Sequence, residues 1–128
     1  MLIEQLNLVK ELNLPVVFHC RMAHQDLIQF LKENDRPEKA LVHGFVENLN
    51  IEGINFEENI KKTPLDKILI ETDCPYLTPP QVASHNKPLY VKYVAEKIAK
   101  IKNLSYEEII KITTENAVRF FNFLGIVR

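Results

Sequence analysis

Three things that this sequence has little of limit what the protein can be. Its 128 residues include only two cysteines, Cys20 and Cys74, so no disulfide framework is indicated and a reducing cytosol is favoured. Sixteen basic residues stand against seventeen acidic ones, which leaves no global charge of one sign to gather nucleic acid or anionic lipid. The longest strongly apolar stretches, such as residues 14–18, are far too short to span a membrane. We therefore expect a cytoplasmic protein with no membrane partner, in which any recognition of DNA is local.

The chain has the size of one domain, 1–128, which buries about two thirds of the surface of its unfolded form. Apolar residues at spacings of four and three predict a first helix that ends at Pro15: Leu2, Leu6, Val9 and Leu12. Short apolar runs predict strands at 15–19, 40–43 and 68–70, with a weaker candidate at 51–54 that contains Gly53.

Helical patterns fill much of the remainder. The helix after the first strand is expected to bury Leu27, Ile28, Phe30 and Leu31, and residues 57–62 could form a turn or two. An apolar stripe at 91–101 follows Pro88, and a capping-box pattern at 105–108 opens a last helix, with a break possible near Thr113 before it continues to Leu124. The Pro-rich stretch 73–88 reads as a functional loop. This order of elements predicts an α/β fold with a mostly parallel sheet and C-terminal helices.

Each of three predicted strands leads into a potential metal ligand: His19, His43 and Asp73. Parallel α/β sheets gather their sites at the carboxyl ends of the strands, so residues far apart in the sequence could meet there. Imidazole and carboxylate ligands suit zinc, manganese, nickel and similar divalent ions. Such an ion lowers the pKa of a bound water and neutralises charge on a phosphate oxygen.

Plainer interpretations stand beside this one. A histidine at the end of a buried strand is often a hydrogen-bonded residue under a loop, and Asp73 could be a turn or capping residue before Pro75. Arg21 could reach a phosphate or form a surface salt bridge. Cys20 and Cys74 follow candidate ligands, but neighbouring residues of a strand point to opposite faces, so packing is the better interpretation for both.

Several segments resemble the TatD family of metal-dependent hydrolases, over nearly the whole chain and in the right order. The run LPVVFHCR at 14–21 resembles the family's strand ending in a metal-binding histidine, and VHGF at 42–45 resembles its second such strand. The most specific match is IETDCPYL at 70–77, close to the family's Glu-Thr-Asp-x-Pro-Tyr-Leu signature. PLDK at 64–67, and Asn116-Ala117 followed by Phe120, also fit.

The resemblance implies a partial TIM-barrel-like fold of the metallo-dependent hydrolase type, and hydrolysis of phosphodiester bonds, with DNA as substrate, at a two-metal site. By it, His19 and His43 are metal ligands, and Asp73 is a ligand or the catalytic base. Arg21, Tyr76 and Lys87 are the expected substrate-binding residues. The cofactor is a divalent ion, Zn, Mn, Mg or Ni.

The chain also departs from the family's pattern. A complete barrel needs about 250 residues, and the family's His-x-His pair has no counterpart in this sequence. Between Phe45 and Ile51 the family's helix is reduced to about five residues, fewer than a parallel crossover needs. The family's Arg-Asn-Glu-Pro motif reads His-Asn-Lys-Pro at 85–88, so Lys87 or Arg21 is left to hold phosphate.

Three hypotheses follow from this sequence. The first is a TatD-like deoxyribonuclease chain that lacks the family's N-terminal half, binds one metal weakly and turns over slowly. The second is a non-catalytic half-barrel whose open sheet edges drive it to pair with itself, as a homo-oligomer completing the sheet, or with a partner. The third is a small open-sheet α/β binding module unrelated to TatD proteins.

Overall fold

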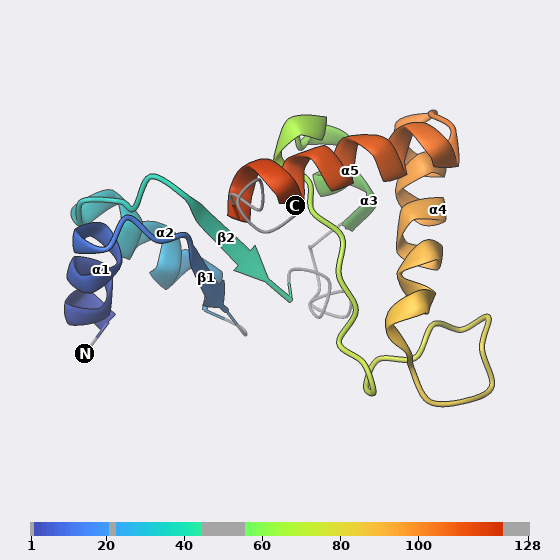
Figure 1. Ribbon diagram of the computed structural model, residues 1–128, viewed down its shortest axis with the longest axis horizontal. Coiled ribbons are helices and arrows are strands. Elements are labelled where there is room, and N and C mark those ends of the chain that lie inside the picture. Colours follow the sequence, from blue (N-terminus) through green and yellow to red (C-terminus); the bar gives the residue numbers. More distant parts are fainter. Residues whose placement is uncertain (1, 21–22, 45–55, 122–128) are drawn as a thin grey trace, which may run out of the picture. The chain divides into compact units, whose positions relative to one another are not determined.

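The computed structural model describes residues 2–20, 23–44 and 56–121 (Figure 1). The helices and strands are, in order, α1 (Leu2–Glu11), β1 (Val16–His19), α2 (His24–Glu33), β2 (Ala40–His43), α3 (Phe56–Lys62), η1 (Leu65–Lys67), η2 (Pro88–Tyr90), α4 (Val91–Lys102) and α5 (Tyr106–Phe121). The chain divides into two compact units, Met1–Ile54 and Asn55–Arg128, each with its own packed elements. The single domain expected from chain length stays a prediction.

The first unit is a β-α-β arrangement preceded by α1. β1 and β2 pair in parallel, in a register that runs from Val16 opposite Ala40 to His19 opposite His43. Both strands end at the histidine that the sequence predicted, so these two predictions are confirmed. α1 ends at Glu11, shortly before Pro15, and Asn13 there adopts the left-handed conformation with φ 51°.

α2 confirms the predicted helix but not its buried side. Ile28 is 48% exposed, and none of the residues His24–Glu33 is fully buried. The expectation that Ile28 is buried was therefore wrong. Helical spacing determines which residues share a face, whereas burial depends on whether another element covers that face, and spacing carries no information about this.

The second unit is built on a helical core. Its buried residues come from α3, α4, α5 and the segment after η1: Ile60, Ile68, Ala95, Ile98, Ala99 and Ile109. α5 is continuous through the position where the sequence suggested a break. The buried Thr113 hydroxyl donates to the Ile109 carbonyl of its own helix, 2.8 Å away. The expected continuation to Leu124 lies outside the described residues.

The predicted strand at 68–70 is the main correction in this unit. Ile68 has extended dihedral angles (φ −95°, ψ 128°) and is buried in the core. Among the described residues, however, the only sheet consists of β1 and β2, so this segment is extended without a ladder partner. An apolar run favours extended backbone, but a strand also requires a hydrogen-bonded neighbour, which the run does not specify. The weaker strand candidate at 51–54 lies outside the described residues.

The capping box predicted at the start of α5 is present. The Glu108 backbone N–H donates to Ser105 Oγ at 3.1 Å, while Glu108 Oε2 accepts bonds from the Ser105 backbone N–H and hydroxyl, both at 2.8 Å. The bonds from the Ser105 backbone and hydroxyl lower the pKa of the Glu108 carboxyl below its ordinary value. The box therefore works best with Glu108 ionised.

Ser105→Ala is expected to lower the free energy of unfolding by about 1 kcal/mol at neutral pH, the usual cost of losing a helix cap. Because the folded-state pKa of Glu108 is lowered, its contribution is present above its unfolded pKa and is lost as the pH falls through the folded value. The difference between variant and wild type should shrink accordingly in urea unfolding at acidic pH. An equal difference at both pH values would contradict a role for the ionised carboxylate.

Candidate functional site

His19 and His43 lie next to each other at the carboxyl ends of the two paired strands. They are partners in the parallel register, so their side chains lie on the same face of the sheet. The ring centroids are 5.4 Å apart and the planes are inclined by 40°. His19 is exposed and His43 is half-buried. The first unit thus presents two imidazoles side by side at one sheet end.

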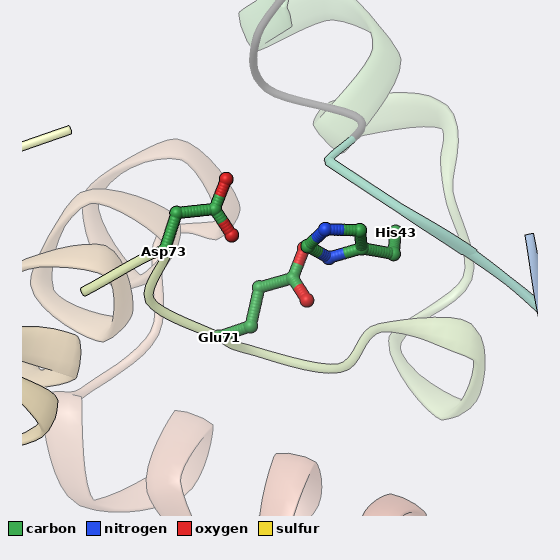
Figure 2. Close-up of side chains that lie close together, drawn as sticks. All are labelled: His43, Glu71 and Asp73. Atoms are coloured by element: carbon green, nitrogen blue, oxygen red, sulfur yellow. The ribbon is translucent and has the colours of Figure 1, made fainter. Parts of the chain in front are cut away.

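Glu71 and Asp73 form a pair of carboxylates in the second unit. Ile68 is in the core and Ile70 packs against it, so the alternation of an extended chain places Glu71 and Asp73 on the opposite face of the segment. One carboxylate oxygen of each lies within 4.8 Å of the other. Both side chains project from the same side of the backbone (Figure 2).

Glu71 was missed as a site residue by the sequence reasoning. The signal that could have found it is the Glu-x-Asp spacing, because residues two apart in extended backbone share a face.

Asp73 also begins a turn, as the plainer interpretation suggested. Its backbone carbonyl accepts a bond from the Tyr76 N–H at 2.8 Å, and the intervening Cys74–Pro75 peptide bond is cis. This turn uses the carbonyl of Asp73, whereas the carboxylate projects beside Glu71. A turn residue and a ligand are therefore compatible roles for the same aspartate.

The loop from Asp73 to Pro88 is closed on itself by one buried side chain, Asn86, which is 5% exposed. Asn86 Nδ2 donates to the carbonyls of Tyr76 and Leu77, at 2.6 and 3.3 Å, and Asn86 Oδ1 accepts the backbone N–H of Lys87 at 2.9 Å. Two of the predicted substrate-binding residues, Tyr76 and Lys87, are thus joined through their backbones. The Tyr76 side chain is 76% exposed. Arg21, the third, lies outside the described residues.

The residue types fit a divalent transition-metal ion. Paired imidazole nitrogens, as in the first unit, suit zinc, nickel and similar ions, and paired carboxylate oxygens, as in the second unit, suit divalent ions as well. Magnesium prefers oxygen donors and fits the carboxylates better than the histidines.

Comparison with known proteins identifies the family. The family model described as TatD related DNase matches residues 1–54 and 51–122. The chain belongs to the TatD-related DNase family. It is 40% identical over 139 residues to the uncharacterized metal-dependent hydrolase YabD of Bacillus subtilis, with 91% of this chain and 54% of YabD covered. It is 36% identical over 138 residues to the deoxyribonuclease TATDN3 of Homo sapiens, with 94% of this chain and 50% of TATDN3 covered.

A solved structure supports the fold class. The crystal structure of YjjV, a TatD homolog from Escherichia coli K12, matches with a TM-score of 0.80 and 27% identity, over 94% of this chain and 55% of that chain. The predicted α/β class with a partial TIM-barrel-like arrangement is therefore confirmed. The chain spans about half the length of the curated relatives it matches. The TatD-family assignment excludes the unrelated binding module.

The shortening after Phe45 stays a prediction, and the comparisons show only that relatives have residues without a counterpart in this chain. The alignments with YabD and with the Escherichia coli hydrolase YcfH run over 139 and 142 positions, more than this chain's 128 residues, so these relatives have residues with no counterpart here. The two matches to the family model meet at residues 51–54. The segment itself lies outside the described residues.

Proposed function

We propose that this chain carries part of the active site of a metal-dependent phosphodiesterase acting on DNA. His19, His43 and Asp73 are the proposed metal ligands, with Glu71 as an additional carboxylate beside Asp73. The observation that carries the proposal is the side-by-side placement of the two imidazoles at paired strand ends, 5.4 Å between centroids. The names of relatives as metal-dependent hydrolases and as a deoxyribonuclease support it.

Each residue has a proposed task. A bound divalent ion supplies Lewis acidity toward a phosphate oxygen and makes a water more acidic. His19 and His43 would donate nitrogen lone pairs to hold the ion. Asp73 would serve as a further ligand, or accept the proton of the attacking water. Lys87 or Arg21 would pair with the phosphate, and Tyr76 would border the substrate.

We propose one ion of the zinc, manganese or nickel type, rather than magnesium, because two of the three proposed protein ligands are imidazoles. With no His-x-His pair in the sequence, the two-metal set implied by the resemblance is incomplete here. Weak binding of one ion and slow turnover by this chain alone follow from that. Each ligand must lose its proton to bind, so affinity falls at acidic pH.

Calorimetric titration of the metal-stripped chain with Zn²⁺ and with Mn²⁺ tests the metal proposal. About one ion per chain is expected, because one set of imidazole and carboxylate ligands is present. The loaded chain should cleave a DNA oligonucleotide and a chromogenic phosphodiester slowly, and a chelator should stop both reactions. Failure of both Zn²⁺ and Mn²⁺ to bind would overturn the metal site. Fast cleavage would overturn the proposal of slow turnover.

A second candidate is the non-catalytic half-barrel that associates with a copy of itself or with a partner. It is favoured by large apolar side chains exposed in the first unit, on and after α1 and on β1: Leu2, Ile3, Leu8, Leu12, Leu14 and Val17. Light scattering on the titrated sample separates the candidates, since a strictly monomeric, metal-binding chain contradicts this one.

A cytoplasmic location remains proposed. Within 2–20, 23–44 and 56–121, no helix has the length and apolar character to cross a membrane.

A further inference from the structure

We propose that Asn86 is a positioning residue for substrate binding. It holds Tyr76 and Lys87, the residues proposed to meet the DNA, in a fixed place beside the turn that begins at Asp73. This inference rests on the proposed metal-dependent function. Asn86 itself is not proposed to touch metal or substrate, because its side chain is buried and bonded to the backbone of the loop.

The hydrogen bonds of Asn86 connect two segments of the loop. Its Nδ2 donates to the carbonyls of Tyr76 and Leu77, and its Oδ1 accepts the Lys87 N–H. An asparagine side chain has two N–H donors and one carbonyl oxygen, so both ends of this amide are engaged. The amide is largely shielded from water, which makes its bonds costly to break.

Further backbone bonds extend this connection to the proposed ligand on one side and to the core on the other. The Tyr76 N–H donates to the Asp73 carbonyl at 2.8 Å, and the Tyr90 N–H donates to the Lys87 carbonyl at 2.9 Å. Tyr90 leads directly into α4, which packs in the core of the second unit. Asn86 therefore links the turn of Asp73 to a helix held by the core. Such a link matters because misplacing a group by 1 Å can cost a factor of about 100 in rate.

The surface supported by Asn86 has two features of a binding surface. Tyr76, Leu77 and Leu89 are 76, 61 and 60% exposed, so large apolar side chains stand in solvent on both of the joined segments. Leu77 has φ 51°, in the left-handed region that a leucine enters only at an energetic cost, and such strain clusters where ligands bind. Together with the exposed Lys87, these side chains offer apolar contact for a nucleoside and positive charge for a phosphate.

Two substitutions separate the two ends of the Asn86 amide. Asn86→Ala removes all three bonds. Asn86→Asp keeps an oxygen that accepts the Lys87 N–H and replaces the donor to the Tyr76 and Leu77 carbonyls by a second oxygen. Ser84→Ala is the matched control, because Ser84 is an exposed polar residue of the same loop and its substitution leaves the Asn86 side chain in place.

The first readout is exchange of backbone amide hydrogens with water, measured by NMR on the metal-free chain. Asn86→Ala should speed exchange at the Lys87 and Tyr76 amides, whereas Asn86→Asp should speed it at Tyr76 and largely spare Lys87. The Tyr76 amide is the informative one, since its bond goes to the Asp73 carbonyl and reports on the turn rather than on Asn86 directly. Ser84→Ala should change neither amide.

The second readout combines Zn²⁺ titration with kinetics on a DNA oligonucleotide, using Asn86→Ala because it adds no charge. Zn²⁺ should bind nearly as tightly as to the wild type, because Tyr76 and Lys87 are not proposed ligands. The kcat/KM for the oligonucleotide should fall about tenfold, mainly through a higher KM, because the two residues that meet the substrate lose their fixed placement. Ser84→Ala should match the wild type in both measurements.

The two readouts keep the proposals apart. Unchanged exchange at the Tyr76 amide in both Asn86 variants would overturn the positioning role, whatever the kinetics. Faster exchange with unchanged KM and kcat would mean that Asn86 only closes the loop, and would overturn it as well. A loss of Zn²⁺ affinity as large as the loss in kcat/KM would assign Asn86 to the ion instead of the substrate. A wild-type chain that binds Zn²⁺ but cleaves no DNA would overturn the proposed function and, with it, the substrate that Asn86 serves.

Discussion

Asp73→Ala is expected to weaken binding of Zn²⁺ or Mn²⁺ by more than about 100-fold, beyond the 10–100-fold typical for residues that only orient ligands. The physical reason is the loss of an anionic oxygen donor from a set with few ligands. His19→Ala and His43→Ala should weaken binding comparably, because each removes one of two neighbouring imidazoles. Titration calorimetry at one pH measures all three changes.

Glu71 and Asp66 make this prediction specific. Glu71→Gln keeps the size of the side chain and removes its charge beside Asp73, so a smaller loss is expected if Asp73 is the ligand and Glu71 supports it. Asp66→Asn removes one negative charge from an exposed position in the same unit, and its carbonyl contact with Arg119 is kept. Weakening by Asp66→Asn equal to that by Asp73→Ala would show a general charge effect and contradict the ligand assignment.

Ile109→Ala is expected to lower the free energy of unfolding of the second unit by about 2 to 5 kcal/mol, the range for truncating a buried isoleucine to alanine. Ile109 is 0% exposed and belongs to the core that also contains Ile68. Truncation removes apolar contacts and leaves a cavity that the surrounding helices can close only in part. Urea unfolding followed by circular dichroism measures the change.

Ile110→Ala is the natural comparison, because the next residue of the same helix only packs against the edge of the core. Its loss should be clearly smaller, since less apolar surface is removed from contact. Equal losses for the two variants would mean that Ile109 does not occupy the centre of the packing.

The amino-acid pattern was sufficient to predict the two strands that end in histidine. A proline or a turn precedes each apolar run, and parallel pairing of such runs brings their last residues together, which is the arrangement of His19 and His43. The family followed from a motif at 70–77 with several fixed residues. The ligand roles themselves stay predictions.

The amino-acid pattern could not predict contacts between residues that lie far apart in the sequence. Ile28 is exposed because burial depends on a covering element. Within 2–20, 23–44 and 56–121, residues 68–70 pair with no strand, because pairing depends on a neighbour. The bonds from Asn116 to Leu65 and Ile68 cross 51 and 48 positions of the chain. The spacing of residues within one helix does not predict a hydrogen-bond partner in a distant segment, so only the folded structure reveals these bonds.

The hydrogen bonds made by Asn86 divide the loop from Asp73 to Pro88 into a base, which these bonds hold together, and a tip. Tyr76 and Lys87 belong to the base, because the side-chain amide of Asn86 is hydrogen-bonded to the backbones of both. Residues 78–85 lie between them and form the tip. Entropy penalises a longer loop only slowly, by about 0.6 kcal/mol for each doubling of its length. New sequence can therefore be grafted between 78 and 85 at small energetic cost while the base is retained. The sequence of the tip can therefore change without altering the residues proposed to hold the ion.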